Sequence, residues 1–327
     1  MDESSIKLSQ NLEKIEFHYL FDDDSIHSID AYTRNSCEKE FLNFITKISS
    51  EFGLVAKVKA EPAKEGSHID VYSIFATLNS LSIPDYVTLV ISIFTLLFSI
   101  KTKDERKGQK LENLLKEAEV IQKLEELKQK GLPIPQNIEN YVNKLCNSRK
   151  LDKQKSNFFK NLSKEKRIKA IEISSKPREL EEKVFSTTIQ RTEFEDYYLE
   201  TDKLDSIIDN NAEIEIISPV LKNGNYSWRG IYIKENLSHE YSMQDKEFKN
   251  KVIDEALTFQ NGTRLQCELE ICRKLNEEGD TINSGYKIKK VFNQYIGDTV
   301  IEMPSGKKRR EKKEIEDSQP SLFDGMI

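Results

Sequence analysis

A charge-free stretch in the first third of the chain constrains the fold more than any other feature of this sequence. Residues 87–100 read VTLVISIFTLLFSI, and the only polar positions are Thr and Ser, whose hydroxyls can bond back to a helix backbone. Ser82 as N-cap, Pro84 in the first turn and Asp85 beside it predict the start of a helix. At about 1.5 Å per residue, the roughly 17 residues from Pro84 onward span about 25 Å, at the short end of a bilayer crossing.

Two interpretations of this helix are open. It is either a transmembrane or re-entrant segment, over residues 71–100, or a helix buried in a protein core. Apolar residues run all round the helix, and neither neighbouring unit has the sequence of a core large enough to enclose it, so we favour the membrane. The residues expected to meet lipid are Val87, Leu89, Ile91, Phe94, Leu97 and Ile100.

Basic residues follow the apolar stretch at once, beginning with Lys101 and Lys103. Such a flank is typical of the cytoplasmic side of a membrane. A single crossing then places the N-terminal unit outside, although the N-terminus lacks the features of a secretory signal; a shallow hairpin that includes VYSIFATLNSL keeps both ends in the cytoplasm. We therefore expect association with inner-membrane lipid and a chain that is mostly cytoplasmic.

A charged amphipathic helix is predicted over residues 101–131, and Gly131, Pro133 and Pro135 end it. A single apolar stripe on a highly charged helix is typical of a coiled-coil seam or a packing face. We therefore expect a homo-oligomer. The stripe consists of Leu111, Leu114, Leu115, Ala118, Ile121 and Leu124.

A basic helical linker is predicted over residues 132–166. Residues 131–170 contain 10 Lys and Arg against 3 Asp and Glu, whereas residues 1–100 contain 8 against 15. Together with Phe158 and Phe159, these cations predict contact with lipid headgroups or nucleic-acid phosphates; the alternative is a solvated helix face with two core phenylalanines. The residues expected to contact an anion or lipid are Lys101, Lys103, Arg106, Lys107, Arg149, Lys150, Lys153 and Lys155.

The sequence before the apolar stretch predicts a small β-α-β unit over residues 1–70. KIEFHYLF and LVAKVKAE have the character of strands, and CEKEFLNFITKISSEFG between them has the spacing of a helix that ends at Gly53. Its apolar stripe consists of Phe41, Leu42, Phe44, Ile45 and Ile48.

The sequence after the linker predicts a strand-rich module over residues 167–302. Its strands are separated by NGN, EEGD and NSG turns, with one helical insert, DKEFKNKVIDEAL. Several short strands with one helix favour a small, partly open barrel or sandwich of the size of an OB fold, with Trp228 in its core. The whole chain is then of the α+β class and ends in a flexible tail over residues 303–327.

No motif in the sequence specifies a reaction. The four cysteines are scattered, and neither GxxxxGK nor GxGxxG occurs. Two His and Asp pairs lie close in sequence, His27 with Asp30 and His68 with Asp70, and ordinary surface positions fit them better than a metal site. We expect no metal, no cofactor and no catalytic residue, and the class that remains is a non-enzymatic binding protein.

The C-terminal module resembles a β-module of uncharacterised bacterial proteins. The segments that carry the resemblance are WRGIY, MQDKEFKNKV and FQNGTRLQCELE, preceded by IEIISPVLKNGNY, with FDDDSIHSIDA and VKAEPAKEGSHID nearer the N-terminus. The layout is similar to that of membrane-linked components of bacterial defence systems. The resemblance implies no activity. It favours a membrane-associated sensor, effector or adaptor in phage defence or stress response, which binds a partner through this module.

The C-terminal QPSLF resembles the peptide by which bacterial replication and repair proteins dock on the DNA sliding clamp. The resemblance implies that Gln319 bonds at the rim of the clamp cleft and that Leu322 and Phe323 fill its apolar pocket. Pro320 stands where such peptides often have Leu. The alternative function is therefore an accessory protein of DNA metabolism, docked on the clamp and contacting nucleic acid.

Overall fold

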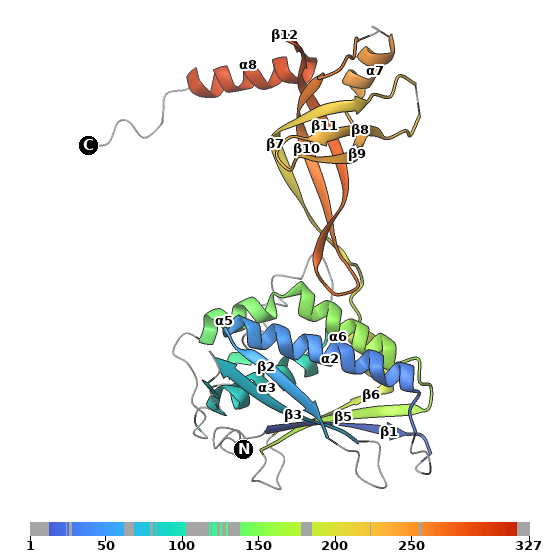
Figure 1. Cartoon of the computed structure of the whole chain (residues 1–327), viewed down its shortest axis with the longest axis vertical. Helices are drawn as coiled ribbons and strands as arrows, with labels where there is room; N and C mark the ends of the chain where they lie inside the picture. Colours follow the sequence, from blue (N-terminus) through green and yellow to red (C-terminus); the bar gives the residue numbers. More distant parts are fainter. Residues whose placement is uncertain are drawn as a thin grey trace, which may run out of the picture. The chain divides into compact units, whose positions relative to one another are not determined.

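The structure, a computed structural model, describes residues 13–23, 25, 28–61, 69–78, 81–82, 84–102, 118, 120–122, 125, 129, 138–177, 185–222, 224–254 and 257–318 (Figure 1). The chain divides into two compact units. Unit 1 comprises residues 1–202 and the turn 277–280, and unit 2 comprises residues 203–276 and 281–327.

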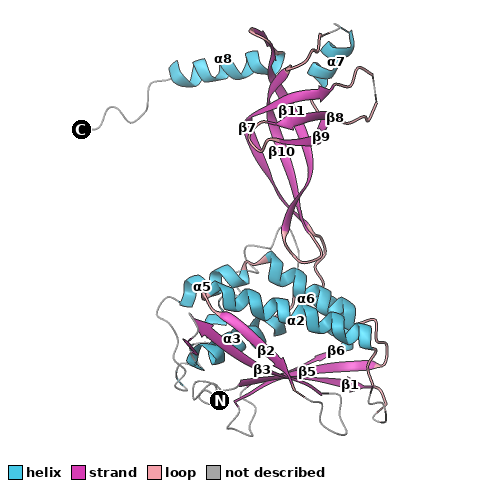
Figure 2. Ribbon diagram, viewed as in Figure 1, coloured by secondary structure: helices cyan, strands magenta, loops and turns pink. Residues whose placement is uncertain are grey.

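Unit 1 is an antiparallel sheet with helices gathered on one face (Figure 2). The strand order is β2-β3-β1-β5-β6, and β4 pairs with β3. The strands are β1 (Glu13–Phe21), β2 (Val55–Ala60), β3 (Ile69–Leu78), β4 (Leu81–Ser82), β5 (Ile168–Pro177) and β6 (Phe185–Gln190). The β-α-β unit predicted for residues 1–70 is therefore part of a larger sheet, because β5 and β6, which the sequence assigned to the C-terminal module, extend it beyond β1.

The described helices of unit 1 include the one predicted before the apolar stretch, the one predicted within it and helical segments of the basic linker, whereas most of the charged helix predicted over residues 101–131 lies outside the described residues. They are α2 (Ala31–Glu51), α3 (Pro84–Ser99), α5 (Ile138–Cys146) and α6 (Arg149–Leu162), and a short 3-10 helix, η1 (Arg191–Tyr197), follows β6. Asp30 caps α2 by accepting a hydrogen bond from the backbone N–H of Thr33 at 2.8 Å, and Gly53 just beyond the helix has φ +69°. The predicted apolar stripe of α2 packs into the core.

The apolar stretch forms α3, and this helix lies in the core of unit 1, in contact with α2 and with β1, β3, β5 and β6. The rings of Phe94 and Phe98 lie 5.6 and 5.4 Å from the ring of Phe44, centroid to centroid, and 6.3 and 6.4 Å from that of Phe17. Of the residues expected to meet lipid, Val87, Ile91, Phe94 and Leu97 are buried, Ile100 is half-buried, and the side chain of Leu89 lies outside the described part.

The membrane segment predicted for residues 71–100 is therefore wrong: β3, β4 and a core helix occupy these positions. The physical reason is the size of unit 1, because the strands added by residues 168–190 give it a core that can enclose a helix with apolar residues on every side. Among the described residues, no helix is both long and apolar enough to cross a bilayer.

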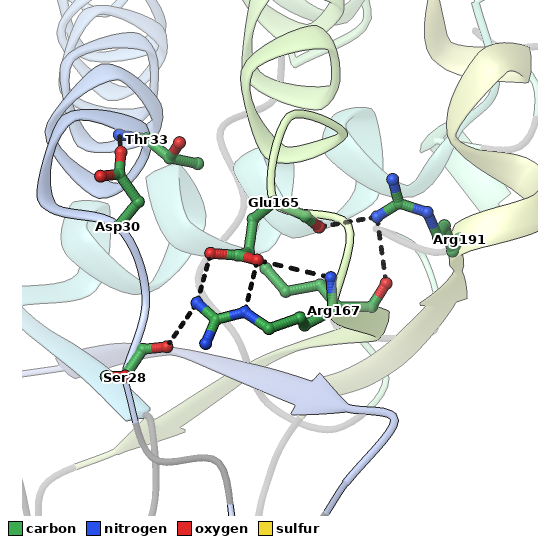
Figure 3. A network of polar contacts seen from close by, with 7 residues as sticks. Ser28, Asp30, Thr33, Glu165, Arg167 and Arg191 are labelled. Carbon is green, nitrogen blue, oxygen red and sulfur yellow. Dashed lines mark hydrogen bonds and ion pairs between the residues drawn. The ribbon is translucent and has the colours of Figure 1, made fainter.

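A polar network joins three loops at one end of unit 1 (Figure 3). The Arg167 guanidinium donates to both carboxylate oxygens of Glu165, at 2.8 and 2.7 Å, and to the backbone oxygen of Ser28 at 3.3 Å. Arg191 donates to three backbone oxygens in the connection between α6 and β5. These hydrogen bonds from Arg167 lower the pKa of Glu165 to about 2. The network fixes the turn before β5, so we interpret its role as structural.

Unit 2 contains a closed five-stranded barrel with the strand order β7-β8-β9-β11-β10, closed by pairing of β10 with β7. Only β9 and β11 are parallel within the described pairings. The elements are β7 (Lys203–Ser218), β8 (Trp228–Tyr232), β9 (Leu237–Met243), α7 (Lys246–Asp254), β10 (Arg264–Leu275), β11 (Thr281–Ile296), β12 (Thr299–Glu302) and α8 (Pro304–Ser318). This order, with a helix between the third and fourth strands, is the connectivity of an OB fold.

The core of the barrel confirms the predicted place of the single tryptophan. Trp228 is 1% exposed, and its ring lies 5.7 Å from that of Phe248 on α7, the predicted helical insert. Gly230, two residues further along the same strand, permits close pairing with β7, because a Cβ at this position would lie 2.6 Å from the backbone oxygen of Glu215.

The C-terminal segment is a helix over most of the part that the sequence assigned to a flexible tail. Residues 304–318 form α8, and their charges are arranged in i,i+4 ion pairs, Lys307 with Glu311 and Arg310 with Glu314 among them. Such pairs are typical of an exposed helix, because side chains four residues apart lie side by side on its surface. The tail prediction was wrong over this range because charge content alone does not distinguish a solvated helix from a coil.

Candidate functional site

A cleft of about 690 Å³ lies on unit 2, lined by residues of α7, α8 and β11, together with residues of β7 and β10. This volume is in the range of pockets that hold a small molecule or a short piece of a polymer. Its cationic side chains are Lys246, Lys289, Lys290, Lys308, Arg309 and Lys312. Its carboxylates are Asp245, Glu247 and Glu268.

The wall formed by α8 is fixed to β11 by direct backbone packing. The backbone N–H of Met303 donates to the backbone oxygen of Phe292 at 2.8 Å, and the Met303 side chain is buried. A Cβ at Gly306 would lie 2.2 Å from the same oxygen, so only glycine permits this approach. The first turns of α8 are therefore held in one position along β11, and the cationic side chains that follow Gly306 line the cleft.

Asp245 joins three elements at the floor of the cleft, where it is 7% exposed. One carboxylate oxygen accepts from the backbone N–H of Phe248 at 3.0 Å and caps α7. The other accepts from the backbone N–H of Val291 on β11 at 2.8 Å and from the Ser305 hydroxyl on α8 at 3.3 Å. The carboxylate is thus committed to holding α7, β11 and α8 together.

The charge of the cleft is positive after its internal ion pairs are taken into account. Six cations face three carboxylates. Glu247 pairs with Lys308 at 2.9 Å, and Glu268 lies 3.9 Å from the ammonium of Lys290. Lys289 and Lys312 pair with Glu270 and Glu316, at 3.5 and 3.7 Å, and neither of these carboxylates lines the cleft. Within the described part of the chain, Lys246 forms no ion pair. A cleft with this surplus favours an anionic ligand.

Arg309 is the second lining cation that forms no ion pair with the described residues. The carbon at the centre of its guanidinium lies 4.3 Å from the centroid of the Phe292 ring, which is a cation-π contact. Phe292 is 5% exposed, so the arginine covers the ring at the edge of the cleft.

The β8–β9 face of the barrel has a different character. Barrels of this connectivity commonly bind oligonucleotides or oligosaccharides on the face of their second and third strands. Here Arg229 on β8 lies opposite Glu240 on β9 in the register of the two strands. The charges on this face are therefore balanced, and the electrostatic surplus lies at the cleft instead.

The described residues offer little for catalysis. They contain no group of three or more His, Cys, Asp or Glu placed to hold a metal ion. Burial raises the pKa of the Cys37 and Cys267 thiols well above the ordinary value, which disfavours the nucleophilic thiolate. Asp30 caps α2, and Asp70 accepts two hydrogen bonds from Arg34, whereas His27 and His68 lie outside the described residues.

The basic residues predicted to meet an anion are mostly engaged within unit 1. Lys101 pairs with Asp196 at 2.6 Å, Lys150 pairs with Asp280 at 2.5 Å, and Arg149 donates to the backbone oxygen of Thr201 at 3.1 Å. Lys103, Arg106 and Lys107 lie outside the described residues, as does most of the charged helix predicted over residues 101–131.

Two of these predicted basic residues are buried, which corrects their expected contact with an anion or lipid. Lys155 is 3% exposed and donates to the backbone oxygens of Leu97 and Ile100, at the C-terminal end of α3, where a helix favours a cation. Lys153 is 5% exposed and binds both carboxylate oxygens of Asp202. Phe158 and Phe159 on α6 lie in the core of unit 1. They are thus the core phenylalanines of the alternative interpretation of this linker.

No family model, curated protein or solved structure matches this chain significantly. The resemblance to bacterial β-module proteins, the role in defence or stress response, the homo-oligomer and the association with the inner membrane therefore stay predictions. Gln319, Leu322 and Phe323 lie outside the described residues, and clamp docking likewise stays a prediction.

Sequence reasoning missed the cleft because its cations come from separate segments. KIKK in β11 and GKKRREKK in α8 are both visible as basic runs. The second run was assigned to the flexible tail and the first to a strand of the C-terminal module. The signal that could have joined them is the small residue Gly306 after MPS, which marks a close approach of the helix to another backbone.

Proposed function

We propose that unit 2 is a nucleic-acid-binding barrel that holds phosphates in the cleft between α7, β11 and α8. The observation that carries the proposal is the convergence of six cations from these three elements, on a barrel with OB connectivity. Lysine and arginine neutralise backbone phosphates without reading sequence, and this contact supplies much of the affinity of such proteins. The proposal develops the alternative function derived from the sequence.

The distribution of the cations favours a polymer over a single small anion. They come from α7, from two adjacent positions of β11 and from residues 308–312 of α8, and Lys313 extends the exposed charge along α8 beyond the cleft. The chain as a whole carries a net charge of −6, so this surplus is local. A local basic surface on an acidic protein binds a polyanion through that surface and repels it elsewhere.

Fluorescence anisotropy with a labelled oligonucleotide, measured over a range of salt concentrations, tests the proposal. Lys246 and Lys312 are exposed and line the cleft, so K246Q/K312Q removes two charges with little effect on packing. We expect weaker binding and a salt slope that falls by about 1.4, since each phosphate contact with a single strand contributes about 0.7.

The matched control is K222Q/K274Q, which removes two exposed lysines of the same unit that do not line the cleft. It should bind as the wild type does. Equal losses of affinity in the two double variants would show that only the total charge of the protein matters. That result would contradict binding in the cleft.

The C-terminal QPSLF supports a second proposal, docking on the DNA sliding clamp. The feature that favours it is position: α8 is a charged, exposed helix that ends at Ser318, immediately before Gln319. A clamp-bound protein with a nucleic-acid-binding barrel would be a coherent accessory factor of DNA metabolism. Pull-down with a purified bacterial clamp tests this proposal independently of the cleft.

A further inference from the structure

The contact between Arg309 and Phe292 gives the cleft a feature that phosphate binding does not require. The guanidinium lies against an aromatic ring that is itself nearly buried, at 4.3 Å from its centroid. Lysines are sufficient for backbone neutralisation, and the cleft has five of them. The arginine adds a planar group whose position is set by stacking and not by an ion pair.

Both members of this contact are held by the backbone. Phe292 belongs to β11, and its carbonyl oxygen accepts from the backbone N–H of Met303. Gly306 lies close to the same carbonyl, three residues before Arg309 in α8. A side chain that projects from a helix fixed in this way loses little further freedom when a ligand stacks on it, which lowers the entropic cost of binding.

The neighbouring arginine of α8 shows that the arrangement is specific to Arg309. Arg310 donates to both carboxylate oxygens of Glu302 and to Glu314, and it does not line the cleft. The nitrogens of the Arg310 guanidinium are therefore engaged in these ion pairs. Arg309 forms none with the residues that the structure describes, so the rest of its planar surface and its N–H donors are available on the cleft side.

We infer that Arg309 is a stacking platform for an unpaired nucleobase, and hence that the ligand of the cleft is single-stranded. This inference rests on the proposed function. Bases of a single strand expose their faces and stack on aromatic rings or guanidinium planes, whereas the bases of a duplex are covered by their neighbours. The phosphates on either side of the stacked base then meet the lysines of β11 and α8.

The test compares R309K, which keeps the charge and removes the plane, with R310K as the matched control. Three labelled ligands of equal strand length are titrated by anisotropy: oligo-dT, the same backbone with abasic sites in place of bases, and a duplex. We expect R309K to bind oligo-dT at least about fivefold more weakly, the lower end of the effect of one base stack, and to bind the abasic strand within about twofold of wild type. R310K should match wild type on all three, and thermal melts confirm that both variants fold.

Two results overturn the inference. In one, R309K binds oligo-dT as tightly as wild type does; in the other, it loses the same factor on oligo-dT and on the abasic strand. If K246Q/K312Q still weakens binding in either case, the proposed function survives without the stacking platform. If wild type binds none of the three ligands, the proposed function fails and this inference fails with it.

Discussion

Asp245 is the residue whose replacement tests most sharply how the cleft is held together. Its two carboxylate oxygens accept from Phe248 N–H, Val291 N–H and the Ser305 hydroxyl, and the group is 7% exposed. D245A removes the cap of α7, which costs about 1 kcal/mol, and leaves a buried backbone N–H of β11 without its acceptor, which costs about 1–3 kcal/mol. We expect a total loss of about 2–4 kcal/mol in the free energy of unfolding of unit 2.

D245S separates the two contributions. A serine caps a helix nearly as well as an aspartate does, but its single hydroxyl cannot also reach Val291. We therefore expect D245S to lie between wild type and D245A, with the cap retained and the bridge to β11 lost. The difference between the two variants measures the cap alone.

The assay follows from the position of the only tryptophan. Trp228 is buried in the barrel core, so urea unfolding followed by tryptophan fluorescence reports unit 2. The reasoning is refuted if D245A lies within about 0.5 kcal/mol of wild type, the range expected for a surface substitution away from such contacts. It is also refuted if D245S is the less stable variant.

Three further predictions concern the rest of the chain. Arg167 lowers the pKa of Glu165 from its ordinary 4.5 to about 2, so the ionised carboxylate contributes stability above pH 4.5 that is lost as the pH falls toward 2. E165Q lacks this contribution, and its difference from wild type in the free energy of unfolding should shrink over this window in acid unfolding curves. A difference that stays constant contradicts the assignment. K155M removes the buried cation at the end of α3 and should cost unit 1 about 2–4 kcal/mol in calorimetry, whereas no loss would mean that the helix end is stabilised otherwise. L322A/F323A should abolish pull-down by the sliding clamp and leave oligonucleotide binding unchanged; retained pull-down removes the docking proposal.

The strands and helices that the sequence predicts well are the ones with a local signal. The stripe of α2 and the alternation of the barrel strands follow from spacing alone, because one face of each element is buried. Trp228 in a strand pattern is a core residue for the same reason. The helical insert α7 was also visible, since its apolar positions Phe248 and Val252 are four residues apart.

The environment of α3 could not be read from its own residues. A helix with apolar residues all round fits a bilayer and a protein core equally well. What decides between them is the pairing of β5 with β1, which joins strands about 150 residues apart and creates the core around the helix. The lysines of α6 were wrongly expected to contact an anion for the same reason, because their partners are distant in sequence. Lys155 donates to backbone oxygens at the end of α3, 55 and 58 residues before it.

The candidate site was invisible for a related reason. The basic runs of β11 and α8 each have an ordinary interpretation as a solvated surface. Only the backbone contact at Gly306 brings them to one cleft. The basic linker over residues 132–166, by contrast, was predicted from the sequence to contact an anion. Several of its cations are instead bound within unit 1.

Ultraviolet crosslinking of wild-type protein to a single-stranded oligonucleotide, with the crosslinked peptides located by mass spectrometry, tests the central claim most directly. The cleft predicts crosslinks in peptides that contain residues 244–254, 287–294 and 304–313, because these segments line it. Crosslinks confined to the β8–β9 face, over residues 226–243, or to the basic helices of unit 1, over residues 138–166, would contradict it.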